Sequence, residues 1–299
     1  MEAEQTVGVE VPASTANLGP GFDVLAAAVD LRLSVWTTER GPARVAMAGE
    51  GAGEIPTDDT NLIWRMFVAY CERFGVEAPE VSLQVDSEIP LERGLGSSAA
   101  AAVSGVALGR ACTRAGGGDQ DLIDLVAAEE GHADNAAAAT LGGIVAVTEG
   151  RARRFEPGPD VAPVLCIPAV RQSTAAARAL LPSAVPLRDA AANGGRTALV
   201  LAGLTGAIPL DADLMRDVLH EPARFRVMPE SAALVSSLRD AGVPACLSGA
   251  GPSVLAVVRA VDEATVDRVR ALAGADWTVR LATWDRSGAA ACPPTVVPR

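Results

Sequence analysis

A turn of glycine and serine stands directly ahead of an alanine-rich run. It reads "GLGSS" from Gly94 to Ser98 and continues as "AAAAVSGVALGRA". A helix that begins here leaves its first backbone amides unpaired and pointed into the turn, where they can bind an anion. Glycine lets the backbone approach phosphate oxygens, and a serine hydroxyl can add a donor or a magnesium ligand. The pattern favours a phosphate site, although an ordinary N-capped helix after a turn also fits it.

The chain contains no lysine, because all 25 of its lysine-plus-arginine residues are arginine. The Walker P-loop and the protein-kinase site both place a lysine on the phosphates, so both are excluded. The turn also matches the dinucleotide pattern GxGxxA, but Pro90, Glu92 and Arg93 stand where a strand should lead into the first glycine. A serine hydrolase is disfavoured as well, since no GxSxG elbow is present.

Polar side chains gather in three further stretches. The segment "VPASTANLGPGFD" (11–23) holds hydroxyls, an amide and a carboxylate, and "EEGHADNAAAATLGG" (129–143) groups acidic, imidazole and amide side chains at a predicted helix end. The last of these stretches, "LSGAGPSVLAV" (247–257), contains another glycine turn, which follows a predicted strand. Each alone is typical of a plain turn or a solvated helix end. Their joint appearance in this order is specific.

The elements that must position these residues are of mixed type. Alternation of apolar and polar residues predicts early strands at 6–11, 31–38 and 81–86, and a later one at 142–150. Helical spacing predicts one helix from Leu62 to before Gly75, a second after the glycine and serine turn, and a third at 119–130.

The stretch 151–160 is charged and then rich in proline and glycine, and we predict a domain joint there. The two predicted domains are 1–157 and 158–299. In the second, the pattern predicts strands at 162–170, 245–248, 253–259 and 277–283, and helices at 174–181, 188–205, 211–219, 230–241 and after Asp262.

Composition excludes several classes of function. The net charge is −12 and the arginines are scattered singly, so no nucleic-acid partner is expected. There is no basic and apolar leader and no apolar run near the roughly 18 residues of a membrane span, which predicts a cytoplasmic protein without a membrane partner. The five cysteines form no CxxC pair, and two histidines are too few for a histidine-based metal cluster.

Taken together, the four stretches resemble the GHMP small-molecule kinases, whose phosphate loop uses backbone amides and a helix N-terminus without a P-loop lysine. They are similar to the homoserine kinase family in particular, which combines a PATSANLGPGFD-like opening, a GHPDN-like segment and an HxPYR-like segment, here "HEPAR" (220–224). The resemblance extends from residue 7 to about residue 258. The chain departs from the family pattern at three places. The segment "ASTAN" reverses the usual order of Thr and Ser, Ala133 stands where proline is common, and Ala223 replaces the usual tyrosine.

The resemblance implies an α+β protein of the GHMP kinase fold, with a ribosomal protein S5 domain 2-like N-terminal domain, a ferredoxin-like C-terminal domain and the active site between them. It implies ATP-dependent phosphorylation of the side-chain hydroxyl of L-homoserine to O-phospho-L-homoserine, in threonine biosynthesis, with Mg²⁺ as cofactor. A homodimer is compatible with it. Two alternatives stay open: a GHMP kinase for another small alcohol, which Ala223 favours, and a non-catalytic ligand sensor, against which Ser98 and Glu130 argue.

The resemblance also assigns residues. Those expected around ATP are Pro90, Gly94, Leu95, Gly96, Ser97, Ser98, Ala99, Ala100 and Asn61. Those expected around the substrate are Asn17, Asp23, His132, Asp134, Asn135, Arg178 and Arg224, the two arginines binding its carboxylate. Ser98 and Glu130 are expected to bind the metal, although the sequence does not firmly rank Glu130 above Glu129.

The same resemblance gives Asp23, Asn135, Ser98 and Glu130 as the catalytic residues. The amide of Asn135 cannot take a proton at neutral pH, so catalysis is expected to rest mainly on positioning and charge neutralisation. Asp23 remains a candidate proton acceptor. His220 is interpreted as a structural histidine, and the turn 248–253 is expected to support the cleft.

Overall fold

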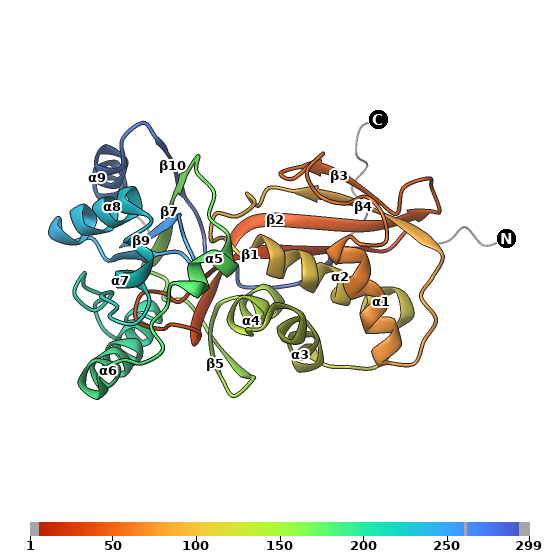
Figure 1. Ribbon diagram of the computed structural model, residues 1–299, viewed down its shortest axis with the longest axis horizontal. Helices are drawn as coiled ribbons and strands as arrows, with labels where there is room; N and C mark the ends of the chain where they lie inside the picture. Colours follow the sequence, from red (N-terminus) through yellow and green to blue (C-terminus); the bar gives the residue numbers. More distant parts are fainter. Residues whose placement is uncertain (1–5, 260–261, 293–299) are drawn as a thin grey trace.

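The computed structural model describes residues 6–259 and 262–292. Two sheets with their helices lie side by side along the long axis, so the molecule is elongated (Figure 1). The first block contains β1 (Gly8–Ala16), β2 (Leu25–Glu39), β3 (Val45–Gly49), α1 (Leu62–Arg73), β4 (Val81–Ser87), α2 (Ser97–Thr113), α3 (Asp119–Glu130), α4 (Asp134–Leu141), β5 (Ile144–Thr148) and β6 (Arg151–Phe155). No helix of the described part is long and apolar enough to span a bilayer.

The second block begins with β7. It contains β7 (Val161–Pro168), α5 (Thr174–Ala179), α6 (Leu187–Leu204), α7 (Glu221–Arg224), α8 (Pro229–Asp240), β8 (Ala245–Leu247), β9 (Val254–Arg259), α9 (Glu263–Ala273) and β10 (Trp277–Leu281). The last described strand, β11 (Ala290–Cys292), returns to the first block and pairs with β1.

The first sheet is organised around β2, which is 15 residues long. Its strand order is β11-β1-β2-β4-β3, and β5 joins β2 and carries β6 at its other edge. Only β3 and β4 run parallel among these pairs. Figure 1 shows α1 to α4 on one side of β1 and β2. The turn that precedes α2 contacts the second block, because Ser248 Oγ donates to the Gly94 carbonyl.

Helix α2 is rich in alanine and glycine because it is buried between the sheet and α1. A Cβ atom on Gly105 would lie 2.3 Å from the Ile63 carbonyl oxygen, and one on Gly109 would lie 2.8 Å from the Tyr70 ring. Small residues therefore let the two helices approach closely, at a cost in intrinsic helix propensity that tertiary packing offsets. This packing fixes the start of α2, and with it the glycine and serine turn.

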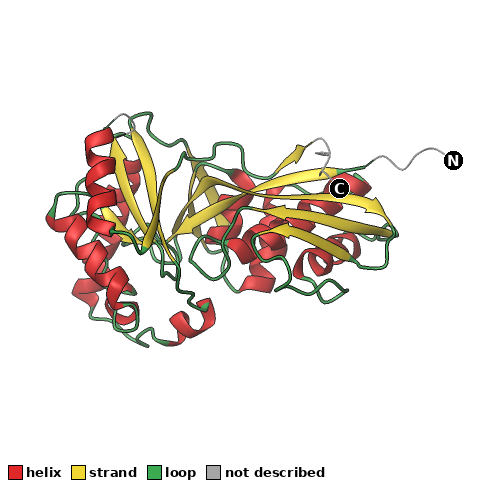
Figure 2. Ribbon diagram, turned by 90° about the horizontal axis from the view of Figure 1, so that it is seen from above, coloured by secondary structure: helices red, strands yellow, loops and turns green. Residues whose placement is uncertain are grey.

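The second sheet is antiparallel with the order β10-β7-β9-β8. In chain order this is fourth, first, third, second, with helices between the first and second strands and between the third and fourth, as in a ferredoxin-like βαββαβ unit. Figure 2 shows most of its helices on the outer side of the sheet, whereas Figure 1 shows α5 at the joint with the first block. Leu234 and Leu238 of α8 and Val266 and Val269 of α9 form a buried cluster with the sheet residues. The expected α+β class is confirmed.

Some predicted elements were wrong or missing. Residues 211–219 form turns, not the predicted helix, because aspartate side chains there bind nearby backbone amides: Asp211 accepts from Leu214 N, and Asp217 from Leu219 N. Residues 151–155, the first part of the stretch predicted as the joint, form strand β6, which pairs with β5; this strand was not predicted. Strand β3 and helix α4 were not predicted.

Candidate active site

The glycine and serine turn, residues 94–99 and from here the Gly-Ser turn, has the backbone form that an anion site requires. Gly94 and Gly96 have positive φ angles of 70° and 68°, and α2 begins at Ser97. The first amides of α2 have no acceptor within the helix. A Cβ atom on Gly96 would lie 2.1 Å from Ser14 Oγ, so no larger residue fits there without movement.

Not every residue of the Gly-Ser turn presents its side chain outward. Leu95, Ala99 and Ala100 are buried, so only their backbone can contribute to a phosphate site. The Leu95 carbonyl accepts from Ser14 N at 3.1 Å. Pro90 lines a separate hollow of about 740 Å³ beside β7 and β10, together with Arg93.

Ser98 and Glu130 contact each other across the start of α2 and the end of α3. Ser98 Oγ donates to Glu130 Oε1 at 2.5 Å. Glu129 instead forms an ion pair with Arg65 of α1, which separates the roles of the two neighbouring glutamates. Hydroxyl and carboxylate oxygens suit Mg²⁺, which usually takes few protein ligands and completes its shell with water and phosphate. The described residues contain no group of three or more His, Cys, Asp or Glu side chains that could hold a metal ion.

A cavity of about 400 Å³ adjoins Ser97 and Ser98. Most of its wall is apolar and comes from β2, β3 and the segments around α1; the lining includes Leu33, Met47, Ile55, Pro56, Leu62 and Ala101. Asn61 also lines it, but its side chain caps α1, accepting from Ile63 N at 2.9 Å and donating to the Pro56 carbonyl at 2.7 Å. Apart from the segment around Asn61, this apolar wall was not predicted from the sequence.

The N-terminal loop, residues 17–23, brings Asn17 and Asp23 to the joint between the two blocks. The Asn17 side chain accepts from Asp23 N at 3.1 Å and donates to the Gly249 carbonyl at 2.8 Å. Asp23 binds Arg178 of α5 in a bidentate ion pair, at 2.8 and 3.0 Å. Two residues that the resemblance assigned to the substrate thus neutralise each other here.

The start of α4 holds His132, Asp134 and Asn135 together. His132 Nδ1 lies 3.0 Å from Asp134 Oδ1, and this hydrogen bond raises the pKa of His132 despite the opposing effect of burial. Asp134 also accepts from Asn135 N at 2.8 Å. Asn135 Oδ1 accepts from Ser14 Oγ at 2.8 Å and lies against Gly96, so α4 contacts the Gly-Ser turn directly.

Arg224 of α7 completes the set from the second block. It is buried, and its Nη1 donates to the Gly249 carbonyl at 3.0 Å and to His220 Nδ1 at 2.9 Å. Burial lowers the pKa of Arg224, as does the nearby charge of Arg178, while Asp23 raises it. The side chains predicted to bind the substrate therefore converge on one place.

The second glycine turn, residues 248–253, connects this charged group to the Gly-Ser turn. Ser248 Oγ donates to the Gly94 carbonyl at 2.7 Å, and Gly249 N donates to the Ala16 carbonyl at 3.0 Å. The Gly249 carbonyl accepts from both Asn17 and Arg224. An anion site and a site with charges of both signs thus share one wall.

Two family models match the chain: GHMP kinases N terminal domain over residues 61–143, and GHMP kinases C terminal over residues 202–273. With the fold and the lysine-free Gly-Ser turn, they define a kinase of the GHMP class.

Homoserine kinases from Streptomyces coelicolor and Streptomyces avermitilis are each 41% identical to the chain over 296 residues, covering 96% of it and 94% and 96% of their own lengths. The crystal structure of homoserine kinase from Cytophaga hutchinsonii has a TM-score of 0.81 at 26% identity and covers 98% of this chain and 99% of its own. The chain belongs to the homoserine kinase family.

Proposed function

We propose that this protein transfers the γ-phosphoryl group of ATP to the side-chain hydroxyl of L-homoserine, giving O-phospho-L-homoserine and ADP. The similarity to homoserine kinases over nearly the whole chain supports this. The observation that carries it in the structure is the second glycine turn, which contacts the Gly-Ser turn through Ser248 and Arg224 through Gly249. A phosphate donor and an amino-acid acceptor would therefore bind next to each other. A cytoplasmic location and a role in threonine biosynthesis belong to the same proposal.

The donor end of the reaction relies on the backbone. The free amides at the start of α2 donate to the phosphate oxygens, and the positive end of the helix dipole at this N-terminus stabilises their negative charge. Phosphoryl transfer asks mainly for positioning and charge stabilisation, which fixed backbone donors supply without a lysine. The apolar cavity beside Ser97 is the place we assign to the adenine ring.

The acceptor end relies on charged side chains. The guanidinium groups of Arg178 and Arg224 bind the α-carboxylate, because planar forks suit that geometry. Asp23 binds the α-ammonium. Asn135 lies against Gly96 of the Gly-Ser turn and, as an amide, would orient the hydroxyl without accepting its proton.

Ser98 and Glu130 would hold Mg²⁺, which supplies positive charge to the phosphate oxygens when bound. Glu130→Gln keeps the size of the side chain and removes its charge, so we expect the rate to fall at least about tenfold, in line with the loss of one charge-assisted contact. The Mg²⁺ concentration for half-maximal rate should rise. Titration of activity with Mg²⁺ checks both.

Glu129→Gln is the matched control. It removes only the surface ion pair with Arg65, which contributes little, so its Mg²⁺ dependence should equal that of the wild type. If Glu129→Gln shifts the dependence and Glu130→Gln does not, the assignment of the metal ligand is reversed.

The choice of acceptor is tested by ADP release. We expect L-homoserine to give a kcat/KM at least about 100-fold above that for mevalonate, galactose or L-threonine, because it alone combines a zwitterion with a primary hydroxyl at the right distance. Ala223 gives the alternative acceptor little support, since Arg224 is held by His220 and Gly249 instead. A higher kcat/KM for another alcohol would support the alternative acceptor. If none of the four compounds causes ADP release, a non-catalytic sensor is favoured.

A further inference from the structure

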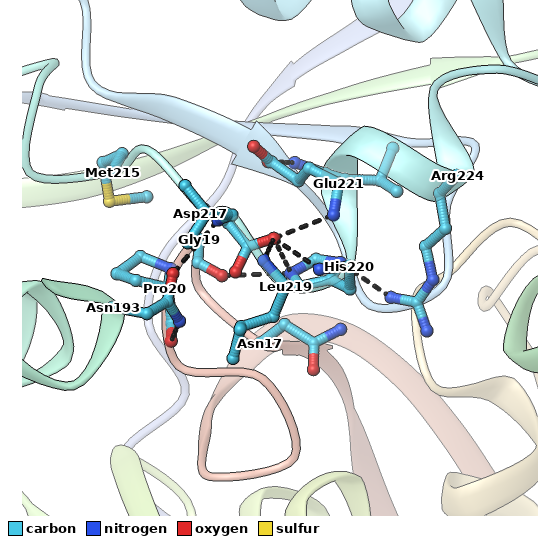
Figure 3. A network of polar contacts seen from close by, with 12 residues as sticks. Asn17, Gly19, Pro20, Asn193, Met215, Asp217, Leu219, His220, Glu221 and Arg224 are labelled. Carbon is cyan, nitrogen blue, oxygen red and sulfur yellow. Dashed lines mark hydrogen bonds and ion pairs between the residues drawn. The ribbon is translucent and has the colours of Figure 1, made fainter. Parts of the chain in front are cut away.

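His220 lies at the N-terminal end of α7, fully buried between the N-terminal loop and Arg224. Figure 3 shows its contact with Arg224 within a buried polar network. The imidazole Nε2 lies 3.0 Å from the Gly19 carbonyl oxygen, and Nδ1 lies 2.9 Å from Arg224 Nη1. The ring also stacks on Phe22, with centroids 5.3 Å apart. His220 therefore touches both blocks of the molecule.

These two contacts fix the protonation state of the ring. A carbonyl oxygen can only accept, so Nε2 must carry a hydrogen; a guanidinium can only donate, so Nδ1 must be bare. Only the neutral Nε2–H tautomer satisfies both, because an imidazolium would place a second cation 2.9 Å from Arg224 Nη1. Burial lowers the pKa of His220 to about 4, outweighing the opposing charge of Asp217.

The contacts of His220 also decide which edge of Arg224 is available. Both hydrogens of Nη1 are used, one by His220 Nδ1 and one by the Gly249 carbonyl. Nε is buried without a hydrogen-bond partner among the described residues. Nε–H and one Nη2–H point in the same direction from a planar guanidinium, and together they form a fork for a carboxylate. The unpaired Nε is thus explained if a ligand carboxylate binds that edge.

We propose that His220 is a positioning residue that holds Nη1 of Arg224 and so presents the Nε and Nη2 edge to the α-carboxylate of the acceptor. The substrate part of this inference rests on the proposed function. The same network reaches Asp23, because Gly19 lies in the N-terminal loop and Asn17 binds both Asp23 N and the Gly249 carbonyl. His220 therefore couples the Arg224 fork to the loop that carries the acidic partner of the substrate.

Two variants separate the two contacts of the ring. In His220→Asn the amide oxygen reaches the place of Nδ1 and can still accept from Arg224, whereas in His220→Gln the amide reaches the place of Nε2 and keeps only the Gly19 contact. We expect His220→Gln to raise KM for L-homoserine at least about tenfold, with kcat and KM for ATP within about threefold of wild type. His220→Asn should keep KM for L-homoserine within about threefold and lower Tm.

Val266→Ala, a cavity variant in the distant α9 core, controls for general destabilisation, since it should lower Tm without changing either KM. Equal increases in KM for L-homoserine in both His220 variants, or none in either, would overturn the positioning role.

The tautomer of His220 can be measured by NMR on the wild-type protein, so this test does not depend on whether a variant folds. The chain has only two histidines, so long-range ¹H–¹⁵N spectra contain two imidazole systems. The hydrogen bond with Asp134 raises the pKa of His132, whereas His220, whose pKa is lowered to about 4, should remain the Nε2–H tautomer from about pH 5.5 to 8. An Nδ1–H tautomer or an imidazolium in that range overturns the proposal whatever the activity, whereas absence of ADP release with L-homoserine overturns the proposed function and the assignment of the Arg224 edge to its carboxylate.

Discussion

Replacing Gly94 with alanine is expected to lower kcat/KM for ATP at least about 100-fold. Gly94 has a φ angle of 70°, where an alanine is strained by about 1–2 kcal/mol. Its Cβ atom would lie 2.2 Å from the Ser248 carbonyl oxygen and 2.9 Å from Gly251 N. Both neighbours are backbone atoms, so no side-chain rotation relieves the clash. The Gly-Ser turn must move, and a misplacement of about 1 Å costs roughly that factor in rate.

Gly75→Ala provides the matched control for this prediction. Gly75 has a φ angle of 67°, but a Cβ atom there would meet nothing within 4 Å. The variant therefore carries the same backbone strain without the clash and away from the turn. It should lower Tm and leave the kinetics of both substrates unchanged. ATP titrations at saturating L-homoserine, with Tm measured for each protein, make the comparison; a Gly94→Ala protein within about fivefold of wild type would contradict a phosphate site at this turn.

The Gly-Ser turn was predictable because its signal is local. Glycines, serines and an alanine run are adjacent in the chain, and helix geometry alone says that the amides at Ser97 and Ser98 are free. The choice between Glu129 and Glu130 was not predictable from local pattern. Neighbouring helix residues point about 100° apart, and which one faces Ser98 depends on how α3 packs against α2.

The apolar cavity and the Arg224 network show the same limit. The cavity wall combines Leu33, Met47 and Leu62 from three separate elements, and no periodicity in one segment marks a shared surface. His220 was interpreted as a structural histidine although it begins the "HEPAR" segment, because the segment alone does not show what the imidazole contacts. Its contact with Gly19 spans 201 residues, so only the fold could relate it to the N-terminal loop.

The second large effect concerns the ion pair of Asp23 and Arg178. Arg178→Gln is expected to lower kcat/KM for L-homoserine by about 100-fold, near the upper end of what one charged hydrogen-bonding partner contributes, with KM for ATP within about threefold. Asp23→Asn should reduce it by a similar factor if Asp23 binds the ammonium. Steady-state kinetics with each substrate varied in turn measure both.

The ion pair between Asp23 and Arg178 leads to a prediction that is more specific than the loss of activity expected for either substitution alone. Asp23 and Arg178 form an ion pair, and a zwitterionic substrate can replace both halves of it, because its ammonium would bind Asp23 and its carboxylate would bind Arg178. The analogue 4-hydroxybutyrate lacks the ammonium and would leave Asp23 without a partner, a cost that Asp23→Asn removes. The preference of the wild type for L-homoserine over 4-hydroxybutyrate should therefore fall at least about tenfold in Asp23→Asn. An unchanged preference would mean that Asp23 does not face the ammonium, and the pair with Arg178 would then serve the free protein alone.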